Sequence, residues 1–313
     1  MALFALSRGV ARSHPVNVSF EFFPPVSEKA EASLWDAVTR LERLAPAFVS
    51  VTYGASGSTR ERTLRTVKRI MDNTSLNVAA HLTCVGASRE EVDAVIGELN
   101  AAGVRRFVAL RGDPEEGVGQ KYQPRADGYA NGAELVAGLK TFGDFDISVS
   151  AYPEKHPESP DFQTDLDMLK RKVDNGASRA ITQFCFDNDV FEAYLERVRK
   201  AGIYIPIVPG ILPIHHFGKV ASFAGRCGAS IPDWLHERFD GLDEDPETRQ
   251  LVSSAVAAEQ VADLVQRGIT DFHFYTMNRA ELPLAVCRLL GIHEDRGGIQ
   301  EASGAGGNEP AAA

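Results

Sequence analysis

NVAAHLTCVGASREEVDAVIGELNAAGVRRFVALRGD, residues 77–113, contains two short apolar runs on either side of one helical pattern. Several runs of this kind in the chain are apolar on both faces, as is typical of strands buried in a parallel sheet. Between the two runs, Ser88 and Glu91 have the spacing of a capping box, which indicates a helix N-terminus. Gly103 stands where that helix should end. The stretch therefore predicts one strand–helix–strand unit.

The same alternation continues along the whole chain. Eight β-branched or aromatic runs are separated by longer helical patterns, at residues 16–23, 48–54, 77–84, 106–113, 146–153, 179–186, 206–212 and 271–277. Gly176, Gly202 and Gly268 end three further helical patterns. Eight such units in a chain of this length predict an α/β fold of the (β/α)8 TIM-barrel type. A doubly wound open sheet is the structural alternative.

Residues 214–266 are too many for one loop and one helix. Ile231-Pro232 and the turn-rich residues 243–246 interrupt them, and a helical pattern follows from Thr248 to Arg267. We therefore expect extra helices inserted after strand seven, covering the mouth of the barrel.

The composition of the chain excludes several classes of function. Of 313 residues, 44% are hydrophobic and 24% charged, and the formal net charge is −10, which argues against nucleic acid or an anionic membrane as the main partner. No stretch approaches 18 consecutive apolar residues. The four cysteines are far apart, which favours a reducing compartment, and we expect a cytoplasmic protein.

Three segments are expected from the distribution of apolar residues. Residues 1–15 form an N-terminal extension without the apolar core of a signal peptide. Residues 16–293 form the barrel. Residues 294–313 are rich in Gly, Ala, Glu and Asn and should be a disordered tail, because they cannot bury enough apolar surface to offset ordering.

Polar side chains gather where the predicted strands end. In TIM barrels the chemistry lies at the carboxyl ends of the strands. In this chain those ends carry Glu21, Tyr53, His81, Arg111, Gly112, Asp113, Tyr152 and Gln183, with Arg279 just past the last strand. Any one of them could be an ordinary loop residue, but together they indicate a site.

Glu21 is the candidate acid of that rim. It lies between aromatic residues and prolines, so poor solvation should raise its pKa and keep the carboxyl protonated near neutrality. That property suits a general acid. The alternative is a structural carboxylate that pairs with an arginine.

Two further stretches suit a phosphate-bearing ligand. In Arg111-Gly112-Asp113 the glycine permits close approach of the backbone and the arginine can bind phosphate, although a loop with Asp113 as a helix cap would look the same. Arg171 and Lys172 could contact a diphosphate, or could simply be part of a solvated helix face.

The usual nucleotide and metal motifs are missing. We find no G-x-G-x-x-G, G-x-x-x-x-G-K-[ST] or H-E-x-x-H sequence. The adjacent pair His215-His216 is not assigned to a metal, because neighbouring side chains diverge. No metal is expected, and any nicotinamide or flavin would be held by barrel loops.

Ten short stretches resemble methylenetetrahydrofolate reductase, in consistent order from about residue 16 to residue 292. They are S-F-E-F-F-P-P (19–25), V-S-V-T-Y-G-A (49–55), H-L-T-C-V-G (81–86), A-L-R-G-D (109–113), A-Y-P-E-K-H-P-E (151–158), L-K-R-K-V-D (169–174), A-I-T-Q-F (180–184), P-G-I-L-P (209–213), F-D-G-L-D (239–243) and H-F-Y-T-M-N-R-A (273–280).

The resemblance implies a TIM barrel with noncovalent FAD. Enzymes of this family take hydride from NADH or NADPH and then reduce 5,10-methylenetetrahydrofolate to 5-methyltetrahydrofolate, in ping-pong fashion, for one-carbon metabolism and methionine synthesis. Family members are often dimers or tetramers, so the resemblance also implies a homo-oligomer, with small-molecule partners and no nucleic acid or membrane.

The resemblance also assigns roles to individual residues. Glu21 matches the general acid that opens the five-membered ring of the folate, and Asp113 matches the carboxylate near the flavin and the pterin. The substrate contacts fall on Thr52, Gln183, Lys219, Phe223 and Arg279. The FAD contacts fall on Tyr53, Ala55, His81, Arg111, Gly112, Asp113, Tyr129, Ala130, Tyr152, His156, Asp165, Arg171 and Lys172.

Two positions depart from the family pattern. Met168 stands where enterobacterial relatives carry a polar amide, and Lys219 stands where an amide is familiar. The first should cost one FAD contact, and the second could shift nucleotide or polyglutamate preference.

Two other functions compete with the flavin-dependent reductase. One is a barrel that moves hydride from nicotinamide to folate without flavin, and the other is a folate-binding barrel without chemistry. The FAD positions argue against the first, and Glu21 argues against the second because binding alone needs no protonated carboxyl.

Overall fold

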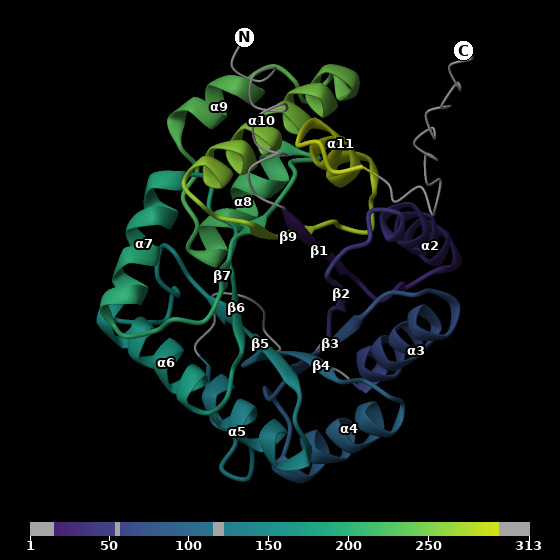
Figure 1. Ribbon diagram of the computed structural model, residues 1–313, viewed down its shortest axis with the longest axis vertical. Coiled ribbons are helices and arrows are strands. Elements are labelled where there is room, and N and C mark those ends of the chain that lie inside the picture. The colour runs from purple at the N-terminus through teal and green to yellow at the C-terminus, as the bar shows by residue number, and fades with distance from the viewer. Residues whose placement is uncertain (1–15, 54–56, 115–121, 294–313) are drawn as a thin grey trace, which may run out of the picture.

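Strands and helices alternate throughout the computed structural model, which describes residues 16–53, 57–114 and 122–293 (Figure 1). The strands are β1 (Asn17–Phe22), β2 (Phe48–Val51), β3 (Val78–Thr83), β4 (Arg106–Leu110), β5 (Asp146–Ala151), β6 (Arg179–Thr182), β7 (Ile207–Val208), β8 (Gly210–Ile211) and β9 (Asp271–Tyr275). Each predicted strand begins within one residue of its observed start. Their ends were predicted too late, because the turn begins earlier than the apolar pattern suggests.

The capping-box and glycine signals singled out in the sequence lie at helix ends, and the helical pattern expected from Thr248 to Arg267 is observed as α10. They are α2 (Glu28–Glu42), α3 (Gly57–Asn73), α4 (Arg89–Ala101), α5 (Gly132–Phe142), α6 (Phe162–Asp174), α7 (Asn188–Lys200), α8 (Phe217–Cys227), α9 (Asp233–Phe239), α10 (Pro246–Gln266) and α11 (Glu281–Leu289). Ser88 and Glu91 form the predicted capping box. The four glycines expected after helices, at positions 103, 176, 202 and 268, all have positive φ, between 74° and 111°.

All strand pairs are parallel, and the sheet closes on itself through one interrupted strand. Ile207 and Val208 in β7 pair with β6, whereas Gly210 and Ile211 in β8 pair with β9. Pro209 separates the two halves, and its carbonyl accepts a hydrogen bond from the backbone of β9. β7 and β8 thus occupy the single predicted strand at residues 206–212, and the TIM-barrel prediction is confirmed. Figure 1 shows the strands around the centre with α2 to α7 outside them.

Alternate side chains of each strand face opposite sides of the barrel wall. In β1, Phe20 and Phe22 belong to the main core, which lies between the wall and the surrounding helices. A smaller cluster that includes Phe48, Val108 and Ile181 comes from the other face of the strands and fills the barrel interior. The inner face of β1 carries Ser19 and Glu21, so the wall places polar groups inside.

Three helices, α8 to α10, lie between β8 and β9. Their apolar residues form a separate cluster in which Leu235 and Phe239 of α9 and Ala224 of α8 pack with Phe184 and Phe186, which follow β6. This cluster attaches the segment to the carboxyl ends of the strands. No helix in residues 16–53, 57–114 and 122–293 is both long and apolar enough to span a membrane.

Candidate active site

Glu21 lies near the carboxyl end of β1 with its side chain inside the barrel. Its carboxyl oxygen is 3.5 Å from Nε2 of His81 in β3 and 4.0 Å from Nε2 of His273 in β9. Burial raises the pKa of Glu21 from 4.5 to about 8. The expected rise in pKa is therefore confirmed, and the carboxyl is mainly protonated at neutral pH.

The two imidazoles beside Glu21 are neutral. Burial lowers the pKa of His81 to about 3, and it lowers that of His273 to about 3 as well. His273 Nδ1 lies 2.7 Å from Ser19 Oγ, and its ring stacks on Phe48 with centroids 5.6 Å apart. His81 Nε2 is buried and has no hydrogen-bond partner among the described residues.

The alternative expectation for Glu21, a structural ion pair with an arginine, does not hold in this structure. Within the described residues, the basic groups recorded in ion-pair reach of its carboxyl are His81 and His273. Because both are neutral, they do not hold Glu21 as a carboxylate. A protonated carboxyl at a strand end is suited to donate a proton.

The rim stretch after β4 is held by the loop that follows β3. The carbonyl of Arg111 accepts backbone hydrogen bonds from Cys84 and Val85. Gly112 has φ +86°, and a Cβ there would lie 2.4 Å from Cγ1 of Val85. Packing against this loop is sufficient to require a glycine at this position.

Asp113 is exposed on the rim. Partial burial raises the pKa of its carboxyl, and the nearby Arg111 guanidinium opposes that rise. The alternative role of Asp113 as a helix cap is wrong, because Asn131 caps the next helix, α5. Asp113 is thus exposed at the mouth and does not cap α5.

Lys172 of α6 is a buried cation beside this rim. Its ammonium donates to the carbonyl of Ser150 at 2.9 Å and to Ser150 Oγ at 3.2 Å. Burial lowers the pKa of Lys172 to about 8, with Asp165 acting in the opposite direction. Arg171, the next residue along α6, is exposed instead. The two cations expected to contact a diphosphate therefore differ in burial: Lys172 is buried and Arg171 is exposed.

Tyr152 and His156, in the β5–α6 loop, lie at the same part of the rim as Lys172 and Arg111. Their rings meet edge to face with centroids 4.7 Å apart. Burial, together with the charges of Arg111 and Lys172, lowers the pKa of His156 to about 4. Asp165 accepts hydrogen bonds from the backbone of His156 and from Ser159. These contacts order the loop that follows β5 next to Lys172.

Three other positions expected at an FAD site, Tyr129, Ala130 and Tyr53, make contacts within the protein. The hydroxyl of Tyr129 donates to Asp93 at 2.7 Å, so its ring is engaged by α4. The backbone N–H of Ala130 donates to Glu134. Tyr53 is half-buried against the main core, and Ala55 lies outside the described residues.

The expected substrate contacts occupy three parts of the mouth. Phe223 of α8 is 39% exposed and stacks on Phe184, beside Gln183. Lys219 is exposed on α8, one turn before Phe223. Thr52 follows β2, where its backbone N–H donates to Phe22, and Arg279 is exposed after β9.

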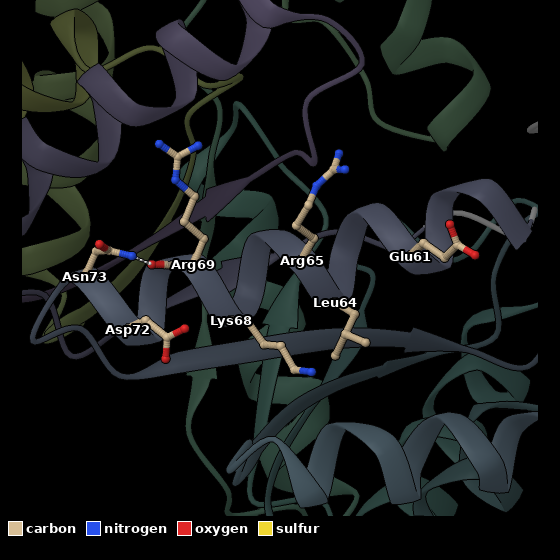
Figure 2. Close-up of a pocket in the computed structure, with 7 residues that line it drawn as sticks. All are labelled: Glu61, Leu64, Arg65, Lys68, Arg69, Asp72 and Asn73. Carbon is tan, nitrogen blue, oxygen red and sulfur yellow. Dashed lines mark hydrogen bonds between the residues drawn. The ribbon is translucent and has the colours of Figure 1, made fainter.

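A shallow hollow of about 450 Å³ lies elsewhere, along the outer face of α3 (Figure 2). Figure 2 shows Arg65 and Arg69 pointing to one side of this helix and Leu64 and Lys68 to the other. These side chains diverge, so the hollow is not a competing site. Among residues 16–53, 57–114 and 122–293, no three His, Cys, Asp or Glu side chains are grouped to hold a metal ion.

Comparison with known proteins gives this geometry its context. The methylenetetrahydrofolate reductase family model matches residues 7–291. The chain belongs to this family. It is 48% identical over 281 residues to 5,10-methylenetetrahydrofolate reductase of Pectobacterium carotovorum, covering 90% of this chain and 92% of the relative. It is also 48% identical to the enzyme of that name from Escherichia coli K12, covering 88% and 91%.

A solved structure shares the fold at low identity. It is an uncharacterized protein from Clostridium thermocellum described as binding two copies of 5-methyl-5,6,7,8-tetrahydrofolic acid. The TM-score is 0.56 at 14% identity, with 92% of this chain and 98% of that chain covered. At this identity the likeness supports the barrel fold and nothing further.

Sequence reasoning missed part of the surroundings of Glu21 in this family member. His273, Ser19 and Tyr275 all point into the barrel, but they belong to largely apolar strands, where a packing role is the natural interpretation. The available signal was strand periodicity, since Glu21 pairs in register with Tyr275 and Ser19 with His273.

Proposed function

We propose that this chain reduces 5,10-methylenetetrahydrofolate to 5-methyltetrahydrofolate, using NADH or NADPH as reductant and noncovalent FAD as carrier. The observation that carries the proposal is Glu21, a buried and protonated carboxyl at the mouth of a barrel whose 48%-identical relatives are named as this reductase. A protonated carboxyl is what opening of a folate ring requires, because the departing nitrogen must take up a proton.

The residues after β4 and β5 fit the diphosphate of FAD. Lys172 is a buried cation whose hydrogen bonds go to Ser150, so its charge can serve an anion. Besides burial, the charge of Arg111 lowers the pKa of Lys172, and the charge of Lys172 lowers the pKa of His156, so the three groups lie close together. Bound FAD would supply a two-electron hydride carrier between the two substrates.

Each of the other expected site residues has a task in the proposed reaction. Glu21 gives its proton to the departing nitrogen of the folate ring, which leaves an electrophilic one-carbon group for hydride. Asp113 assists folate binding, and Gln183 and Phe223 bind the pterin or the nicotinamide. Arg279 binds the glutamate end of the folate, and Thr52 contacts the nicotinamide.

The proposal predicts a yellow protein with two separable half-reactions. Anaerobic NADH or NADPH should bleach the flavin absorbance, and methylenetetrahydrofolate should restore it. A protein that stays colourless after incubation with FAD, yet reduces the folate, would support the flavin-independent alternative. A protein that binds folate without either colour change would support the non-catalytic alternative.

The same assay determines whether NADH or NADPH is the preferred reductant. Bleaching rates with NADH and NADPH, measured at matched concentrations, give the preference directly. The exposed Lys219 makes this comparison informative, and Lys219→Gln, which restores the amide familiar in the family, tests whether this position shifts the preference.

A further inference from the structure

Two consecutive residues after β9 adopt the left-handed backbone conformation. Met277 has φ 53° and Asn278 has φ 56°. Side chains with a Cβ rarely adopt this region, and asparagine tolerates it best among them. Such conformations persist only where surrounding contacts hold them, and they concentrate at functional sites.

The side chain of Asn278 supplies those contacts. Its Oδ1 accepts the backbone N–H of Phe23 at 2.8 Å, and its Nδ2 donates to the backbone carbonyl of the same residue at 2.9 Å. The amide thus pairs with Phe23 as a neighbouring strand would. It continues the β1–β9 ladder, which in the backbone ends at Glu21 and Tyr275.

Thr276 completes the connection between the two segments. Its hydroxyl donates to the backbone carbonyl of Glu21 at 2.5 Å and accepts the N–H of Asn278 at 3.1 Å. Glu21 and Phe23 are therefore both held by the turn after β9. On that turn Met277 is 51% exposed at the mouth, and the N–H of Arg279 donates to the carbonyl of Thr276.

We propose that Asn278 is a positioning residue that ties the strand carrying Glu21 to the turn carrying Met277 and Arg279. It thereby fixes the position of Glu21, the proton donor, relative to Met277 and Arg279 in the part of the mouth proposed to bind the folate. This inference rests on the proposed function, in which Glu21 is the proton donor. Asn278 itself acts on the backbone of Phe23 and does not touch the reacting atoms.

Three substitutions separate the amide contact from backbone strain. Asn278→Gly keeps the left-handed conformation accessible but deletes the amide. Asn278→Asp keeps the acceptor for Phe23 N–H but places an oxygen against the Phe23 carbonyl. Ala45→Gly is the matched control, because Ala45 also has positive φ (47°) but lies between α2 and β2, at the opposite end of the barrel.

The first measurement compares the two half-reactions. In Asn278→Gly and Asn278→Asp, reoxidation by methylenetetrahydrofolate should slow between about 10- and 100-fold, since small displacements of a catalytic group have effects of this size. Bleaching by nicotinamide should stay within about 2-fold of wild type, and Ala45→Gly should change neither rate. Equal losses in both half-reactions, or a wild-type rate in Asn278→Gly, would overturn the inference.

The second measurement needs no bound flavin. Infrared titration of the protein without FAD should show the protonated carboxyl band of Glu21, identified by its loss in Glu21→Gln. The titratable groups that face Glu21 are His81 from β3 and His273 and Tyr275 from β9, while β2 contributes Ser50. In Asn278→Gly the midpoint of that band should move toward the ordinary range of a glutamate, because the strand end becomes more solvated.

The two measurements keep the inference and the function apart. If the wild-type protein fails to reduce methylenetetrahydrofolate, the proposed function is wrong, whatever the variants do. If it succeeds and the Asn278→Gly titration midpoint equals that of wild type, the positioning role is wrong and the function stands.

Discussion

The two ends of the barrel hold charged side chains in opposite ways. At the end where the strands begin, Asp146 contacts Arg106 and Arg179 and accepts a hydrogen bond from Ser178 at 2.6 Å. Burial alone would raise the pKa of Asp146, but that hydrogen bond and the two guanidinium groups hold it below its usual range. The carboxylate at this end is therefore satisfied by its neighbours.

At the mouth, Glu21 and Lys172 are buried without an oppositely charged hydrogen-bond partner among the described residues, although Arg111 nearby pairs with Glu158. Burial raises the pKa of Glu21 to about 8, and it lowers that of Lys172 to about 8. Charges that neutralise one another stabilise a fold, whereas groups kept at unusual pKa values are available to a ligand or a reaction. The contrast agrees with the site that the sequence places at the mouth.

The largest expected effect comes from removing the acid at the mouth. Glu21→Gln should slow folate-driven reoxidation by about 1,000-fold, because a positioned general acid contributes on the order of 10²–10⁴. Nicotinamide-driven bleaching should remain within about 2-fold, since that step needs no proton from Glu21. Stopped-flow absorbance of the flavin measures both, and equal loss of both steps would show that Glu21 is not the proton donor.

The buried cation gives the next effect. Lys172→Met should weaken FAD binding by about 100-fold, since loss of a charge-assisted contact costs roughly 2–3 kcal/mol. The protein without FAD should be as stable as wild type or more so, because an incompletely neutralised buried charge is removed. Titration calorimetry with FAD gives the affinity. The exposed Arg171 offers a matched control. An equal loss of FAD affinity in Arg171→Met would contradict a special role for the buried Lys172.

The alkaline limb of the folate half-reaction should follow the pKa of Glu21. Only the protonated form can donate, so the folate half-reaction should decline as pH rises through about 8, by about tenfold per pH unit above it. Bleaching by nicotinamide should lack this limb. Rates of both half-reactions measured between pH 6 and 9.5 test this prediction. A decline common to both steps would show that Glu21 is not the titrating group.

The smallest effect on function belongs to the opposite end. Asp146→Asn should leave both half-reactions within about 2-fold, since its partners lie away from the mouth. Its cost in unfolding free energy should grow as pH rises, because the pKa of Asp146 is lowered in the folded state and only its carboxylate contributes stability.

Glu21→Gln should show the reverse dependence on pH. The folded state keeps a proton on Glu21 that the unfolded chain releases above about 4.5, so wild-type stability falls as pH rises from about 4.5 to about 8. The glutamine variant should therefore gain relative to wild type over that window. Urea unfolding of both variants at pH 5 and pH 8 tests the comparison, and parallel changes would contradict it.

The amino-acid sequence by itself determined the succession of elements and the identity of the rim. Strand starts, the capping box at Ser88 and the glycines that end four helices depend on neighbours within a few residues, so local pattern is sufficient for them. The raised pKa of Glu21 was also predictable, because its aromatic and proline neighbours already indicate poor solvation.

Only the tertiary structure decided which of these groups meet. It placed His81 and His273 beside Glu21, separated Lys172 from Arg171, assigned Gly112 to packing against Val85, and joined Asn278 to Phe23 across more than 250 residues. The physical reason is closure of the barrel. Register between β1 and β9 is fixed only when the first and last strands pair, and no local pattern records that pairing.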